Sequence, residues 1–222
     1  MNNGFAVLPG VFAVGEIENI AREVESNLIR RSRAGARHLL AVHSMAALAR
    51  DSRLMSIAAE ALGGEPIPFG ATLFDKSLAT NWLVAWHQDT ALPLRERRDA
   101  EGWGAWSIKG GITYAHAPTS ALSQVIALRV HLDSSTVDNG PLRVLPGTHR
   151  LGVLTDEQIH VVASEKEPVT CTVDRGGVLV MRPLLVHASS KAATDAPRRV
   201  LHLEYASTSD FEFGIRLHLA QA

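Results

Sequence analysis

The strongest constraint on the fold of this chain is a series of short apolar runs, separated by turn residues, that begins near residue 66. The runs include "GATLFDKS", "NWLVAWHQD", "SQVIALRVHLD", "GGVLVMRPLLVHAS" and "RRVLHLEYA", and turn signals such as "DNGP" and "RGG" lie between them. Many short strands at this spacing are typical of an all-β sandwich or barrel rather than of a βαβ sheet. We therefore predict a mainly β, cupin-like jelly roll, or double-stranded β-helix, over about residues 66–222.

Residues 1–65 show a different, helical pattern. The stretch 14–30 places apolar residues three or four positions apart, and a second stretch over roughly 44–62 ends at the pair Gly63-Gly64. Such spacing is typical of amphipathic helices, and a glycine pair is a good helix-terminating signal. Because 222 residues at 46% hydrophobic content can bury a sizeable core, we expect one domain, 1–222, in which these helices flank the β core.

Composition limits the classes of partner. The net charge of −1 creates no global field that would attract nucleic acid or an anionic membrane. The single cysteine, Cys171, excludes an internal disulfide and agrees with a reducing compartment. The N-terminus shows no signal-peptide pattern, and no apolar run is long enough to span a bilayer. We expect a cytoplasmic protein that acts on a small molecule, without nucleic acid or membrane partners, and the oligomeric state stays open.

A pair of metal-ligand side chains stands in the apolar run "WLVAWHQDTALPL" at residues 82–94, which we interpret as a β-strand. In a strand, residues i and i+2 point to the same face, so His87 and Asp89 project together and Gln88 points the other way. The pair is either half of a metal site or an ordinary hydrogen-bonded pair. Iron(II) oxygenases bind their metal with two histidines and one carboxylate, so a distant histidine would complete the first possibility.

The best third ligand by position is His187 in "LLVHASS", at the end of the apolar strand that follows a glycine pair. His131 and Asp133 repeat the His-x-Asp spacing and compete with the first pair. However, only the interval between His87 and His187 comfortably holds the strands that a jelly roll needs. Asp133 also runs straight into a turn. We therefore favour His87, Asp89 and His187, and we interpret His131 as structural.

A carboxylate-bearing cosubstrate would require a fixed cation, and arginine offers a planar fork that matches a carboxylate. Arg198 and Arg199 open the last long strand of the predicted sheet. Strand alternation allows only one of them to point inward. The pattern alone does not choose between them, since a barrel interior can be apolar or polar.

Several stretches, in this order and spacing, resemble the phytanoyl-CoA dioxygenase family of iron(II)/2-oxoglutarate oxygenases. They are "WHQD" at 86–89, "DNGPLRVLPGTHR" at 138–150, "GGVLVMRPLLVHASS" at 176–190 and "DAPRRVLHLEYA" at 195–206, and the opening "GFAVLPGVFAVGEIENI" resembles the same family. The resemblance spans most of the chain. It implies a double-stranded β-helix with His87, Asp89 and His187 as iron ligands, and Fe(II), 2-oxoglutarate and O2 as cofactors.

The resemblance also implies cosubstrate-binding residues. The family's 2-oxoglutarate arginine lies eleven residues after the distal histidine, which corresponds to Arg198 and leaves Arg199 as the fallback. A small hydroxyl residue near the same carboxylate corresponds to Ser189. Gln88 matches a glutamine close to the cosubstrate, although alternation turns it away from the ligand pair. Lys76 in "FDKS" resembles a lysine upstream of that pair.

The expected activity is hydroxylation of a small molecule, with release of succinate and CO2. Halogenating relatives lack the carboxylate ligand, whereas Asp89 is present here. Two alternatives stay open: another metal-dependent cupin enzyme that does not use 2-oxoglutarate, and a non-catalytic jelly-roll binding protein.

Residues 95–120 lack clean periodicity and contain Trp103 and Trp106. Such a long irregular segment is interpreted either as a lid or substrate loop, or as a solvated surface loop with its tryptophans packed underneath. We predict Trp103, Trp106 and Arg95 as substrate residues, since Arg95 begins a short basic run that would attract an anionic substrate.

Overall fold

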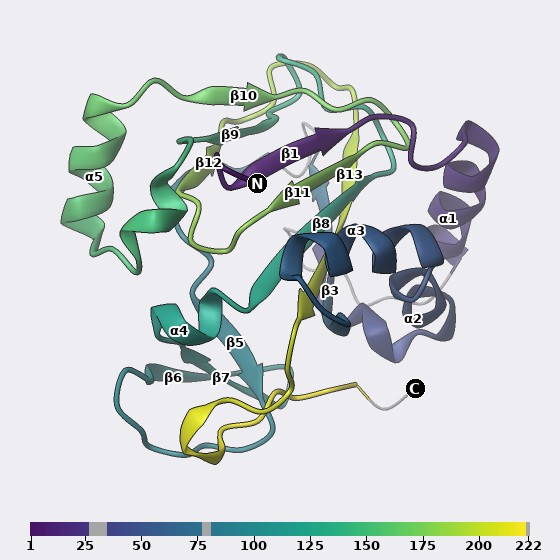
Figure 1. The fold of residues 1–222 in the computed structure, drawn as a ribbon. Helices are drawn as coiled ribbons and strands as arrows, with labels where there is room; N and C mark the ends of the chain where they lie inside the picture. Colours follow the sequence, from purple (N-terminus) through teal and green to yellow (C-terminus); the bar gives the residue numbers. More distant parts are fainter. Residues whose placement is uncertain (27–34, 77–80, 221–222) are drawn as a thin grey trace.

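The fold is mainly β, as predicted, and its paired strands form three antiparallel sheets (Figure 1). A computed structural model describes residues 1–26, 35–76 and 81–220. The six-stranded sheet has the order β1 (Phe5–Leu8), β11 (Val178–Met181), β8 (Val125–His131), β13 (Arg198–Ala206), β3 (Ile67–Lys76) and β2 (Gly35–Ala36). The four-stranded sheet has the order β10 (Val169–Cys171), β9 (Leu142–Val144), β12 (His187–Ser189) and β4 (Val84–His87). The three-stranded sheet has the order β5 (Ala91–Leu94), β7 (Ile112–His116) and β6 (Gly104–Lys109).

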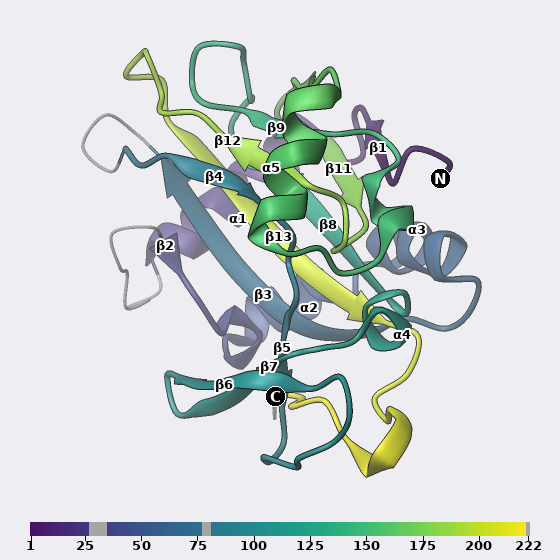
Figure 2. The same cartoon turned by 90° about the vertical axis from the view of Figure 1, so that its left-hand side faces the viewer.

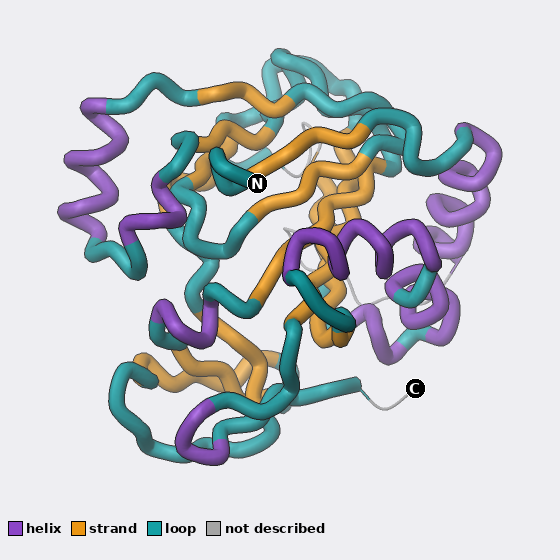
Figure 3. Tube along the Cα trace, in the orientation of Figure 1, coloured by secondary structure: helices purple, strands orange, loops and turns teal. Residues whose placement is uncertain are grey.

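The three N-terminal helices lie together on one side of the strands, and α5 (Asp156–Glu165) lies on the opposite side (Figure 3). The three that precede the β core are α1 (Val14–Ser26), α2 (His43–Ala49) and α3 (Ser52–Leu62). The later helices are α4 (Thr119–Leu122) and α5, and short 3-10 turns occur at Leu39–Ala41, Thr148–Leu151 and Glu212–Gly214. No helix within the described ranges is long and apolar enough to cross a membrane.

The helical predictions are correct in kind but need one correction. The helix predicted over 14–30 is present as α1, and residues 27–30 lie outside the described ranges. The single helix predicted over 44–62 is instead two helices, because Asp51 starts a new one by accepting a hydrogen bond from the backbone N–H of Arg53. Gly63 ends α3 in the left-handed conformation, at φ 75°, as its sequence signal indicates.

Strand β13 divides the core from the polar interior of the barrel. Leu201, Leu203 and Tyr205 belong to the apolar core that the strands share with α1, α2 and α3, and the Tyr205 hydroxyl donates to the carbonyl of Ala49 at 2.9 Å. The alternate residues, Arg198 among them, therefore face the interior between the sheets. Figure 2 shows β13 beside β3, with β4 and β12 next to one end of this pair.

The segment 95–120 is not irregular. It contains β6 and β7, which pair with β5 to form a separate sheet, and it ends in α4. The periodicity is hidden because a register shift lies between Gly104 and Ser107, and Ala105 has a positive φ of 45°. A local irregularity of this kind interrupts the two-residue alternation that strand prediction relies on.

Candidate metal centre

Three side chains converge at one end of the barrel. The potential ligand atoms of His87, Asp89 and His187 all lie within 4.8 Å of one another, and no other group of this kind occurs in the described part of the chain. The Asp89 carboxylate lies between the two imidazoles, with Oδ1 at 3.6 Å from His87 Nε2 and Oδ2 at 3.5 Å from His187 Nε2. Two imidazoles and one carboxylate are the donor set that the sequence predicted.

The strands that carry these residues differ from the prediction in two respects. The strand expected through Asp89 ends at His87, and the backbone N–H of Asp89 donates to the carbonyl of Pro183, outside strand β12, at 2.9 Å. His187 does not end the strand β11 but begins the separate strand β12 after a turn that contains Pro183. Proline has no N–H with which to continue a ladder. The two histidines nevertheless meet, because His87 and His187 are register partners in the antiparallel pair of β4 and β12.

Backbone carbonyls orient both imidazoles. His87 Nδ1 donates to the carbonyl of Ala85 at 2.9 Å, and His187 Nδ1 donates to that of Leu185 at 2.8 Å. This arrangement leaves each Nε2 unprotonated and facing Asp89, which is the form of histidine that binds a metal. The sequence alone offered no partner for either ring.

Electrostatics favours the ligating form of Asp89 and of His187. Burial alone would raise the pKa of Asp89, but His187 and His87 together lower it below its ordinary range. Burial lowers the pKa of His187 to about 4, which favours the neutral ring. Although burial opposes it, Asp89 raises the pKa of His87. Two imidazole nitrogens and one ionised carboxylate fit Fe(II).

A small cavity of about 80 Å³ adjoins the three ligands, and most of its charged wall is basic. Lys76, Arg129 and Arg198 line it, whereas Asp89 is the one carboxylate among its lining residues. Lys76 Nζ donates to Ser189 Oγ and to the carbonyl of Ser190, both at 2.7 Å. The surplus of cations makes this wall complementary to an anion.

The structure separates the two candidate arginines. Arg198 is buried in the cavity wall, and burial together with the nearby charge of Arg129 lowers its pKa. Arg199 points to the opposite face of β13, where its Nε donates to Asp133 Oδ2 at 2.8 Å and its Nη1 pairs with Glu25. Arg199 therefore does not line the metal cavity.

The competing His-x-Asp pair has structural partners. His131 is buried and donates through Nδ1 to the carbonyl of Arg129 at 3.0 Å. Asp133 accepts three hydrogen bonds from the backbone and guanidinium of Arg199. These contacts agree with the structural interpretation of His131.

Gln88 does not reach the cavity. Its Nε2 donates to the carbonyls of Gly152 at 2.9 Å and Leu184 at 2.7 Å, and its Oε1 accepts from the N–H of Leu154 at 2.8 Å. The side-chain amide thus ties three backbone segments together on the side away from the ligands, as strand alternation indicated. These contacts favour a structural role for Gln88, and its place beside a cosubstrate stays a prediction.

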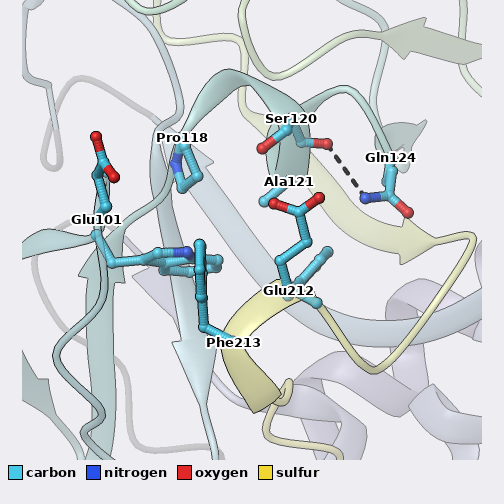
Figure 4. Close-up of a pocket in the computed structure, with 10 residues that line it drawn as sticks. Glu101, Pro118, Ser120, Ala121, Gln124, Glu212 and Phe213 are labelled. Carbon is cyan, nitrogen blue, oxygen red and sulfur yellow. Dashed lines mark hydrogen bonds between the residues drawn. The ribbon is translucent and has the colours of Figure 1, made fainter.

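The three predicted substrate residues also lie away from the metal cavity. Trp103 packs against Phe211, with ring centroids 5.6 Å apart, and helps to line a separate cavity of about 340 Å³ that Figure 4 shows between Glu101, Pro118 and Phe213. Trp106 lies under the Arg97 guanidinium, 5.4 Å from its ring centroid. Arg95 lines another cavity, beside Asp210 and Arg216.

Sequence reasoning missed Arg129. Its side chain is buried at 5% exposure, and its Nη1 donates to His202 Nδ1 at 3.1 Å. The signal was present, since Arg129 is the one charged residue within the apolar strand "VIALRV". A buried cation in such a strand needs a polar interior to face.

A sequence model of the phytanoyl-CoA dioxygenase (PhyH) family matches residues 1–200. Ectoine dioxygenase from Sphingopyxis alaskensis is 24% identical over an alignment of 253 positions, which covers 94% of this chain and 74% of that enzyme. Ectoine dioxygenase from Halomonas elongata is 28% identical over 166 residues, which cover 68% of this chain and 44% of that enzyme.

Solved structures share the fold. The crystal structure of EctD from S. alaskensis with 2-oxoglutarate and 5-hydroxyectoine has a TM-score of 0.69 at 22% identity, covering 94% of this chain and 73% of that chain. The structure of HygX from Streptomyces hygroscopicus with nickel, 2-oxoglutarate and hygromycin B has a TM-score of 0.68 at 22% identity, covering 95% of this chain and 86% of that chain. The double-stranded β-helix predicted from the sequence is therefore confirmed.

Proposed function

This chain belongs to the phytanoyl-CoA dioxygenase family, and we infer that it is an iron(II)- and 2-oxoglutarate-dependent dioxygenase. The observation that carries this function is the convergence of His87, Asp89 and His187 beside a cavity with basic walls. The metal ligands alone would fit other metal-dependent cupins, and the basic cavity favours an enzyme with an anionic cosubstrate. The intact ligand set argues against a non-catalytic binding protein.

His87, Asp89 and His187 would hold the iron. Their Nε2 atoms and carboxylate already face one another, and the carbonyls of Ala85 and Leu185 fix the ring orientations. Iron(II) bound by two histidines and one carboxylate keeps coordination positions open, and it supplies the activation of dioxygen that the reaction requires.

Arg198, Ser189 and Lys76 would hold the far carboxylate of 2-oxoglutarate. Arg198 supplies a planar guanidinium, and its Nε donates to the carbonyl of Asn139 at 3.3 Å. Lys76 and Ser189 are already hydrogen-bonded to each other in the same wall. Because these groups are buried, each keeps its orientation before the ligand arrives, which lowers the entropic cost of binding.

Apolar side chains shield the same cavity from water. Phe74, Trp82 and Leu142 line it, and Lys76 Nζ lies 5.1 Å from the Trp82 ring centroid. The overall reaction is hydroxylation of a small molecule, in which 2-oxoglutarate and O2 yield succinate and CO2 and one oxygen atom enters the product. Small molecules in the EctD and HygX structures support this substrate class.

We propose further that residues 1–222 act as one oxygenase domain. The N-terminal strand β1 pairs with β11, and α1 contacts β13 through the ion pair of Glu25 and Arg199. The N-terminal part therefore shares a sheet and a core with the strands that hold the ligands.

Anaerobic addition of Fe(II) and 2-oxoglutarate to the apoprotein tests the function. A visible metal-to-ligand charge-transfer band is expected, and it should weaken or shift in Asp89→Ala and Arg198→Ala. Bound metal without the band would indicate a cupin enzyme that does not use 2-oxoglutarate. Absence of metal binding would indicate a binding protein.

A further inference from the structure

The inward face of β13 carries opposite charges towards its two ends. Arg198 lies in the basic wall of the metal cavity, and Glu204 lies on the same face about 20 Å further along, at roughly 3.3 Å per residue. Glu204 lines a second cavity, of about 180 Å³. The function proposed above leaves this carboxylate without a role.

The second cavity is apolar apart from a few polar groups. Among its lining residues Glu204 is the one carboxylate, and no lysine or arginine lines it. Strands β3, β7 and β13, the 3-10 turn Leu39–Ala41 and the segment after β13 all contribute to its wall, which is completed by His38, Leu40, Ala41, Phe69, Gly70, Ala71, Thr72, Pro93, Ile112, Tyr114, His218 and Ala220. A mostly apolar cavity with one charged group is the usual form of a small-molecule site.

In the part of the chain that the structure describes, the Glu204 carboxylate forms no salt bridge with a lysine or arginine within 4.0 Å. The Nε2 atom of His202 lies 4.0 Å from Glu204 Oε1. His202 accepts a hydrogen bond at Nδ1 from the Arg129 guanidinium, so its ring is the neutral tautomer. Burial, followed by the charge of Asp89, raises the pKa of Glu204 to about 8, and Arg37 offsets these effects only in part. A buried carboxylate of this kind is costly until a cation pairs with it.

The neighbouring strand leaves space for this carboxylate. Gly70 on β3 is the register partner of Glu204, and a Cβ at Gly70 would overlap Glu204 Oε2. The carboxylate therefore lies over bare backbone. Tyr114 supplies an aromatic wall to the same cavity, and aromatic faces attract cations.

We propose that Glu204 is the specificity-determining residue of the substrate cavity and that the substrate carries a cationic group, such as a protonated amine or an amidinium. The cation pairs with the Glu204 carboxylate and holds the molecule between this residue and the metal ligands. This inference rests on the proposed function, since it assigns the substrate class of the same site. His202, whose Nε2 lies 4.0 Å from Glu204 Oε1, accepts a hydrogen bond from Arg129, and Arg129 lines the metal cavity, so buried side chains connect the two cavities.

Binding of matched probes tests the proposal. Cyclohexylammonium and its neutral counterpart cyclohexanol suit the cavity, because a cavity of about 150 Å³ accommodates a six-membered ring. Calorimetry would measure both probes on the full chain, loaded anaerobically with Fe(II) and 2-oxoglutarate. We expect cyclohexylammonium to bind the wild type at least tenfold more tightly than Glu204→Gln, whereas cyclohexanol should bind both equally. Glu101→Gln, a carboxylate lost from the separate cavity of Figure 4, should behave as the wild type.

A second variant guards against a folding artefact. Gly70→Ala keeps the charge of Glu204 but displaces its carboxylate, so it should also weaken amine binding. Three results would each overturn the proposal. The wild type and Glu204→Gln could bind the amine with equal affinity, the wild type could bind cyclohexanol as tightly as the amine, or the wild type could fail to bind the amine. The charge-transfer band of the wild type distinguishes failure of this inference from failure of the proposed function. A band without Glu204-dependent amine binding refutes this inference alone, and a missing band refutes the proposed function.

Discussion

His87 and His187 face each other across two antiparallel strands, and their ring centroids lie 4.1 Å apart. They are register partners although a hundred residues of chain separate them. Asp89 lies beside both rings because the chain leaves β4 immediately after His87. The metal centre thus depends on the pairing of two short strands and on the turn that follows one of them.

Replacement of Asp89 by alanine should remove metal binding while the fold persists. Asp89 is the one carboxylate of the ligand group, and its charge offsets that of the metal. Even loss of an outer-shell partner typically costs about 10- to 100-fold in metal affinity, so loss of a ligand should cost at least as much. Titration with Fe(II) or Co(II) checks this result. Asp99→Ala removes an exposed carboxylate and should bind metal normally, and unchanged affinity in Asp89→Ala would remove the ligand assignment.

The two adjacent arginines should give opposite phenotypes. Arg198→Ala should weaken 2-oxoglutarate binding strongly, because it removes a buried cation from the cavity wall. Arg199→Ala should leave that affinity unchanged but lower the free energy of unfolding by about 1–3 kcal/mol, since Asp133 loses its charged hydrogen-bond partner. Calorimetry and thermal denaturation of both variants separate the effects. Weaker 2-oxoglutarate binding in Arg199→Ala, with unchanged binding in Arg198→Ala, would show that Arg199 is the cosubstrate arginine.

The affinity for 2-oxoglutarate should depend on pH through Lys76. Burial, with the charges of Arg198 and Arg129, lowers the pKa of Lys76 to about 8. Above pH 8 the free protein loses this positive charge, so affinity for the dianion should fall as pH rises. In Lys76→Met the affinity should be lower at pH 7 and this step should vanish. Lys166→Met, which replaces an exposed lysine at the C-terminal end of α5, should retain the pH dependence. An unchanged profile in Lys76→Met would exclude the proposed role of Lys76.

The same shift predicts how the stability of the free protein varies with pH. The pKa of Lys76 in the folded chain lies below its ordinary value of 10.5, so the unfolded chain binds more protons between about pH 8 and 10.5. The contribution of Lys76 to stability therefore rises with pH over this window. Denaturant unfolding measures the free energy of unfolding of the wild type and of Lys76→Met at pH 7.5 and at pH 10. The difference in this free energy between the two proteins should be smaller at the higher pH.

Much of the fold followed from local pattern. The alternation on β13 placed Arg198 and Arg199 on opposite faces, but only the packing of Leu201, Leu203 and Tyr205 on the helices showed which face is inward. That choice depends on tertiary contacts, which a single strand does not contain. The second helix was predicted as continuous because its apolar spacing runs across Asp51, whose capping role needs the local backbone geometry.

The site was predictable where one residue type dictates the chemistry. Because His131 and Asp133 repeat the His-x-Asp spacing, the ligand group could be proposed only when the distant His187 and the family resemblance were considered with it. Arg129 and Glu204 were not distinguished, because a charged residue in a strand reveals its partners only once neighbouring strands are in register. Trp103 was predicted as a substrate residue because its segment lacks clean periodicity. Its ring belongs to an apolar cluster with Phe211, and the substrate role stays a prediction.

Substitution of Gln88 tests whether this residue has a structural role or binds the cosubstrate. Its amide makes three hydrogen bonds to the backbone at Gly152, Leu154 and Leu184, so Gln88→Leu should lower the free energy of unfolding by about 3 kcal/mol. The 2-oxoglutarate affinity of the folded variant should stay within twofold of the wild type, because the side chain does not line the cavity. Gln124→Leu, which removes one exposed hydrogen bond, should change neither quantity appreciably. Weaker 2-oxoglutarate binding at unchanged stability would instead place Gln88 beside the cosubstrate.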